Sequence, residues 1–327
     1  MSGAPAAASG ENEGSVRGEG GLLCAPSLPR RRPDPFSVKN MTAKSRVNSQ
    51  STTGSNPWPF FALTLGWSWL FWIPAVLSGQ NITVFPTTLL FVLGGLSPAL
   101  AALILTYLTQ GAEGQRDYWY RVIDFKRIRM SWYGAILLIA PLYSALALLT
   151  GILIEGNVPF LETAASYLSN PSTILPFATF TLIYGPVPEE LGWRGYALDR
   201  LQRKWSALTS SAVLGVFWSF WHLPMFFMKG SLMSEVFPLG SARFWIAFGP
   251  GILAEAIIMT WIYNNTQRST LSAILFHFMM NFTGEFLRLP GSFKNYQFVW
   301  LVIIAITVVI AWGPATLTRQ HKEPSPA

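Results

Sequence analysis

The sequence predicts an all-α membrane protein, a polytopic bundle of about eight transmembrane helices. Of its 327 residues, 51% are hydrophobic and only 12% are charged, about half the charge of a typical soluble domain. Apolar stretches near the roughly 20 residues that a bilayer requires recur between Trp58 and Gly313. The single cysteine, Cys24, rules out an intrachain disulfide and a cysteine-based zinc site, so helix packing must stabilise the fold.

The chain is predicted to have three parts. The first is rich in Gly, Ser, Pro and Ala, lacks a sustained apolar pattern, and is expected to be disordered. Met1 and Met41 both remain possible starts of the chain, and no apolar run there is long enough for a secretory signal. The parts are the N-terminal tail 1–55, the transmembrane domain 56–315 with its motif-bearing core at about 170–290, and the C-terminal tail 316–327.

The distribution of Lys and Arg supports eight spans and gives their orientation. Of 23 basic residues, 19 fall on one side of the predicted bundle and four on the other, so the positive-inside rule places both termini in the cytoplasm. This orientation accounts for the net charge of +7 without nucleic-acid binding. We expect an integral protein of a bacterial inner membrane, because the chain is compact and lacks eukaryotic targeting signals. The eight segments lie at about 58–78, 85–108, 132–154, 172–188, 206–228, 244–263, 269–287 and 297–313.

Two further patterns refine this bundle. Proline pairs, such as Pro186 with Pro188, predict kinks or breaks in the spans. The segment 116–129 interleaves aromatic side chains with cations, which suits either a helix lying in the headgroup layer or an ordinary positively charged loop.

Ionisable groups inside the spans are the candidates for chemistry. A charged side chain at the centre of a span costs about 2.5 to 3.5 kcal/mol on insertion scales, and such groups usually face the protein interior or a wet cavity. They occur in three places: Glu189, Glu190 and Arg194 at the end of the fourth segment, His222 in the fifth, four residues after Trp218, and His277 in the seventh, four residues before the amide Asn281.

Helical spacing indicates which of these side chains can lie together and what each can do. Residues four apart share a helix face, so Glu190 can pair with Arg194, and His277 and Asn281 can point to one place. Glu189 is rotated by about 100° from Glu190 and can face a cavity. A carboxylate beside an imidazole can take a proton from water and return it to a leaving amine. Hydrogen-bond donors can stabilise a developing oxyanion, so this set of groups predicts hydrolysis of an amide bond.

The three motifs, Glu189-Glu190-x-x-x-Arg194, an aromatic residue four before His222, and His277-x-x-x-Asn281, resemble those of the CPBP family. This is the CAAX protease and bacteriocin-processing family of intramembrane proteases, which includes the type II CAAX prenyl endopeptidases. Trp218 stands where the family usually has Phe, which bears on pocket shape and substrate preference. The resemblance implies a glutamate-type endopeptidase in which Glu189 and His222 activate water, His277 and Asn281 bind the oxyanion, and Glu190 and Arg194 support the site.

Alternatives remain at the level of the sequence. The expected form uses no cofactor, but Glu189, His222 and His277 are also a possible ligand set for catalytic zinc. A transporter-like bundle or a membrane scaffold is the non-enzymatic alternative. The expected partners of the protease are membrane lipid and a peptide or protein substrate, prenylated or not. Glu255 either lines the substrate cavity or has a structural role, and Glu285 with Arg288 is predicted to form a surface pair.

Overall fold

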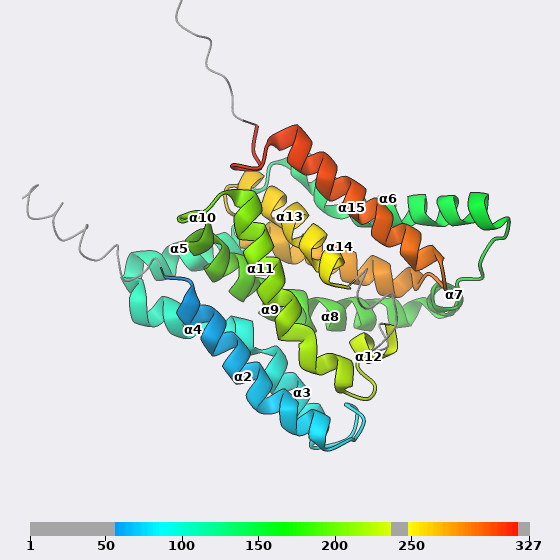
Figure 1. Cartoon of the computed structure of the whole chain (residues 1–327), viewed down its shortest axis with the longest axis horizontal. Coiled ribbons are helices and arrows are strands. Elements are labelled where there is room, and N and C mark those ends of the chain that lie inside the picture. Colours follow the sequence, from blue (N-terminus) through cyan, green and yellow to red (C-terminus); the bar gives the residue numbers. More distant parts are fainter. Residues whose placement is uncertain (1–55, 237–247, 320–327) are drawn as a thin grey trace, which may run out of the picture. The chain divides into compact units, whose positions relative to one another are not determined.

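The computed structural model describes residues 56–236 and 248–319, and every regular element within them is a helix (Figure 1). The predicted N-terminal tail lies outside the described residues, as does most of the predicted C-terminal tail. The first half contains α2 (Trp58–Leu77), α3 (Thr87–Gly95), α4 (Ser97–Thr109), α5 (Gly111–Ile123), the 3₁₀ turn η2 (Phe125–Arg127), α6 (Met130–Glu155), α7 (Glu162–Ser169) and the 3₁₀ turn η3 (Pro171–Thr173).

The second half carries the three motifs. Its helices are α8 (Ile174–Tyr184), α9 (Pro186–Gly192), the π-helical segment η4 (Trp193–Ala197), α10 (Leu198–Gln202), α11 (Ala207–His222), the 3₁₀ turn η5 (Leu223–Phe227), α12 (Leu232–Val236), α13 (Gly249–Asn265), α14 (Thr270–Leu287) and α15 (Phe293–Trp312). Within the described residues, each of the eight predicted apolar segments coincides with one helix or with two consecutive helices, so the predicted helical bundle is confirmed. The start of the predicted segment 244–263 lies outside the described residues.

Length and apolarity separate the helices into two groups. Within the described residues, α2, α6 and α15 are each long and apolar enough to cross a bilayer, and α3 with α4 would make a fourth span that bends by 45°. The motif-bearing helices are shorter or more polar than these. Polar side chains inside an integral membrane protein require protein neighbours rather than lipid. The helix packing gives the motif-bearing helices such neighbours.

Helix packing surrounds the motif-bearing segments with the other spans. Helix α11 packs on α13, α14 packs on α6, and α9 packs on both α4 and α14. The α9–α4 contact depends on Gly192, because a Cβ atom there would lie 2.5 Å from Cβ of Pro98. Only glycine therefore allows these two backbones to come so close.

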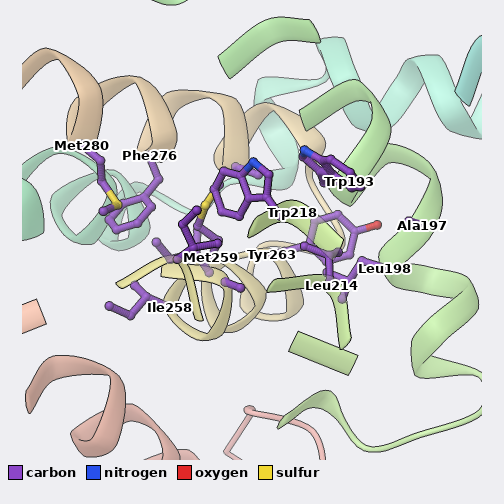
Figure 2. Packing of buried hydrophobic residues seen from close by; sticks show 14 of the residues in the cluster. Trp193, Ala197, Leu198, Leu214, Trp218, Ile258, Met259, Tyr263, Phe276 and Met280 are labelled. Atoms are coloured by element: carbon purple, nitrogen blue, oxygen red, sulfur yellow. The ribbon is translucent and has the colours of Figure 1, made fainter. Parts of the chain in front are cut away.

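The core is rich in large buried side chains (Figure 2). Trp193, Trp218 and Phe276 are almost fully buried and come from η4, α11 and α14. Leu214 and Met259 belong to the same cluster. The core thus lies against the segments that carry the motifs and limits their movement.

Helix α5 is docked by buried polar contacts at one end of the bundle. Its Arg121 is 2% exposed and donates hydrogen bonds to Tyr263 Oη (2.8 Å), the Gly195 carbonyl (2.9 Å) and Asp199 Oδ2 (3.1 Å). Arg268 also binds Asp199. The sequence suggested a headgroup helix or a charged loop for this segment. The structure shows a helix as far as Ile123, and its Arg121 joins α5 to η4, α10 and α13.

Candidate active site

The fourth predicted segment breaks where the acidic motif begins. Helix α8 ends at Tyr184, Gly185 separates it from α9, and Pro186 occupies the first position of α9, where its missing N–H is not needed. A Cβ atom on Gly185 would lie 3.3 Å from Nδ2 of Asn281 and 3.9 Å from Oε1 of Glu189. The glycine therefore lets the acidic motif approach the amide of the third motif closely.

The helix continues beyond Glu190 as the π-helical segment η4. Such segments are rare and often occur at functional sites. Here the segment contains Arg194, which still reaches Glu190, since Nη1 lies 2.9 Å from Oε1 and 3.0 Å from Oε2. Both side chains are fully buried, and the predicted ion pair is confirmed.

Glu190 also receives the imidazole of the third motif. Nδ1 of His277 lies 2.9 Å from Oε1 of Glu190, and because a carboxylate can only accept, Nδ1–H is the donor. Nε2 is then the ring nitrogen that remains for the cavity. Glu190, Arg194 and His277 therefore form one buried network in which a second residue orients the imidazole.

Glu189 and His222 share a different partner, Trp218. The indole Nε1–H donates to Oε2 of Glu189 at 2.6 Å. One turn further along α11, Nδ1 of His222 lies 2.8 Å from the Trp218 carbonyl. A carbonyl only accepts, so His222 donates from Nδ1 and keeps a lone pair on Nε2. Trp218 thus fixes the carboxylate through its side chain and the imidazole through its backbone.

The ring of Trp218 also packs between the other members of the site. The guanidinium of Arg194 lies 4.9 Å from the ring centroid, within the range of a cation–π interaction. The imidazole of His277 meets the same ring edge-on at 5.3 Å. The sequence predicted an aromatic residue that shapes the pocket, but it did not predict this hydrogen bond to Glu189.

A cavity of about 610 Å³ joins the motifs. Glu189, His222, His277 and Asn281 all line it, and the fully buried Glu190 and Arg194 lie behind it. Its remaining walls are largely apolar and aromatic, and they come from α2, α3, α6, α8, α13 and α15 among others. The structure therefore brings together all the site residues that the sequence singled out.

The structure also decides two questions outside the three motifs. Glu255 on α13 lines the cavity, which the sequence left open. The predicted pair of Glu285 with Arg288 is wrong, because Nη2 of Arg288 lies 3.2 Å from Oε2 of Glu235 instead. Arg288 follows the end of α14 with a left-handed backbone, at φ 39°, and so no longer shares a helix face with Glu285.

The zinc alternative, with Glu189, His222 and His277 as ligands, stays a prediction. Among residues 56–236 and 248–319, no three His, Cys, Asp or Glu side chains converge as metal ligands. His222 and His277 each use Nδ1 for a hydrogen bond, to Trp218 and to Glu190 respectively, and keep Nε2 for the cavity. Metal dependence is a question for measurement on the purified protein.

The fold and the cavity define the class: an integral membrane protein of packed helices with a buried Glu–His–Asn site. Residues 171–283 match the family described as type II CAAX prenyl endopeptidase Rce1-like. CAAX prenyl protease 2 of Methanococcus maripaludis is 28% identical over 256 residues, which cover 78% of this chain and 93% of that protein. Both comparisons support the resemblance to the Rce1-like group of the CPBP family that the three motifs carry. The same matches support a membrane-embedded protease.

Proposed function

We propose that this protein cleaves a peptide bond of a membrane-presented substrate with water activated by Glu189 and His222. The observation that carries the proposal is that both side chains are held by Trp218 and line one cavity with His277 and Asn281. A general base must lie within reach of the proton that it removes, directly or through one water. A water in this cavity has a carboxylate and an imidazole lone pair along its wall.

The chemistry follows from which atoms remain available. Oε2 of Glu189 accepts a hydrogen bond from the indole N–H of Trp218, which leaves Oε1 for water. Oε1 takes one proton while the hydroxyl oxygen bonds to the substrate carbonyl carbon, with Nε2 of His222 accepting a hydrogen bond from the same water. When the C–N bond breaks, the proton moves from Glu189 to the leaving amine. The products are a carboxylic acid and an amine, and no other reactant is consumed.

His277 and Asn281 supply the proposed oxyanion site. They lie one turn apart on α14, and both line the cavity. The Asn281 amide and a protonated His277 Nε2 can each donate to the oxygen that becomes negative in the tetrahedral intermediate. Glu190 supports this arrangement because it holds the His277 ring, and Arg194 balances the buried carboxylate.

The substrate class follows from the relatives and from the lining of the cavity. The related protein is named a CAAX prenyl protease, and we extend that class to this chain as a peptide substrate with or without a prenyl group. The largely apolar, aromatic wall from Trp72, Phe177 and Phe180 to Phe298 suits lipid or apolar side chains. We place the protein in a bacterial inner membrane with both termini cytoplasmic, on the charge asymmetry of the sequence.

Glu189→Gln tests the function directly. The amide keeps the shape of the side chain but cannot take a proton from water, so cleavage of a membrane-presented peptide should fall by about 10² to 10⁴-fold. Purified protein in lipid nanodiscs, with prenylated and unprenylated peptides and mass-spectrometric detection, provides the measurement. Glu113→Gln, an exposed change on α5, is the matched control. Normal turnover by a folded Glu189→Gln variant would refute the proposal, and activity measured before and after chelation determines metal dependence.

A further inference from the structure

Two carboxyl groups that line the cavity, Glu255 and Glu285, have no part in the proposed chemistry. Glu285 lies near Arg288 and Lys294, whereas Glu255 lies near the catalytic groups. Glu255 projects from α13 and lines the same cavity as Glu189 and His277. Within the residues that the structure describes, its side chain makes no hydrogen bond and belongs to no ion pair. It is close enough to interact electrostatically with His277 and Arg194. A partly buried carboxyl group that faces a largely apolar cavity without a direct partner is costly, so this one calls for an explanation.

The charges of the cavity favour a cation as the missing partner. Arg194 and His277, the cations nearest to Glu255, are both already paired with Glu190. Glu189 is held by a neutral indole, and in the described part of the chain it has no ion pair. The catalytic end of the cavity therefore presents two carboxyl groups, Glu189 and Glu255, to a substrate. In an apolar cavity such charges act more strongly than they would in water.

The cations at the other end of the cavity do not fill this role. Arg288 lines the cavity but is bound to Glu235, and Lys294 has a contact of its own. Glu255 thus remains available to a group that arrives with the substrate. A carboxylate binds ammonium and guanidinium groups through charge-assisted hydrogen bonds.

We infer that Glu255 is a specificity-determining residue that binds a basic side chain, lysine or arginine, of the substrate peptide. The inference rests on the proposed function and names a feature of its substrate. A cavity of about 610 Å³ is of the size that encloses a small ligand, so the basic residue lies within a few positions of the scissile bond. Glu255 selects the peptide, and Glu189 acts on its bond.

The test compares peptides that differ only in charge. Lysine and its uncharged counterpart norleucine are placed in turn at each of the three positions on either side of the cleaved bond. kcat/KM is then measured in nanodiscs. The wild-type protein should prefer lysine at one position by about tenfold or more, since removing one partner of a buried charge pair costs at least that much. Glu255→Gln should bring the lysine-to-norleucine ratio close to one, whereas Glu113→Gln should leave the ratio unchanged.

A binding measurement separates this inference from the proposed chemistry. The same peptides are titrated against Glu189→Gln protein and against the double variant Glu189→Gln with Glu255→Gln, and no turnover is needed. Tighter binding of the lysine peptide that disappears in the double variant supports the inference even if Glu189 is not the catalytic base. Equal ratios in the wild type and Glu255→Gln would overturn it. An equal loss of both peptides in a folded Glu255→Gln protein would also overturn it, because that result indicates a role in the reaction itself.

Discussion

At the scale of single residues, Trp218 has the largest number of roles in the site. Its indole N–H holds Glu189, its carbonyl holds His222, and its ring contacts Arg194 and His277. The motif spacing predicted that the aromatic side chain at this position helps to shape the pocket. It could not predict the hydrogen bond, because the spacing fixes only which residues share a helix face. The partner on α9 depends on how two distant helices pack.

Trp218→Phe isolates the indole hydrogen bond. Phenylalanine keeps an aromatic ring and the backbone carbonyl that binds His222, but it cannot donate to Glu189. Losing a hydrogen bond to a charged group costs about 1.5 to 3 kcal/mol. If that bond orients the base, kcat should fall about 10- to 100-fold while KM changes little. Steady-state kinetics in nanodiscs give both values, with Trp119→Phe on the exposed face of α5 as the control. A rise in KM with normal kcat would instead assign Trp218 to substrate binding.

At the scale of helices, the site depends on breaks as much as on the spans. Gly185 divides α8 from α9, and the π-helical segment η4 follows directly. Hydropathy found all eight apolar segments because burial in lipid or protein demands apolar residues over long windows. The same averaging hides a break of one residue. The prolines near Pro186 predicted that this segment is irregular, but not that Gly185 approaches Asn281.

Gly192→Ala tests the contact between α9 and α4. The added Cβ would lie 2.5 Å from Cβ and 2.6 Å from the carbonyl oxygen of Pro98, so the helices must separate. Overpacking of this kind costs about 1 to 3 kcal/mol and should displace Glu189 and Glu190, which lie on the same short helix. We expect a lower melting temperature and reduced turnover. Gly134→Ala on α6, where nothing lies within 4 Å of the new atom, is the matched control and should melt at or above the wild-type temperature. Identical behaviour of both variants would show that the α9–α4 contact is not limiting.

At the scale of the whole molecule, distant segments meet at two polar networks, one in the cavity and one beside α5. The sequence predicted the first, because intramembrane Glu, His and Asn at helical spacing are costly without a common site. It did not predict the second. Arg121 and Asp199 stand among many charged residues of loops and short helices, where composition gives no reason to single them out. Only the folded structure shows that Arg121 of α5 reaches Asp199 of α10 and Tyr263 of α13.

The network beside α5 should make stability depend on pH. Burial alone raises the pKa of Asp199, but the hydrogen bond from Arg268 and the charge of Arg121 outweigh it and lower this pKa below the ordinary value of 3.8. The stabilisation is therefore complete above about pH 4 and is lost as pH falls through the lower, folded-state pKa.

Asp199→Asn should lower the melting temperature at pH 7, by the equivalent of about 1.5 to 3 kcal/mol. The difference from wild type should begin to narrow below about pH 4, where Asp199 of the unfolded chain becomes protonated, and should disappear once Asp199 of the folded protein is neutral as well. Thermal unfolding in detergent, from pH 7 down to the lowest pH at which the fold survives, measures this difference in melting temperature. The control variant Glu113→Gln should melt at the wild-type temperature throughout that range. A gap between Asp199→Asn and wild type that widens on acidification would contradict this assignment, since it would require the carboxylate to be protonated more easily in the folded protein than in the unfolded chain.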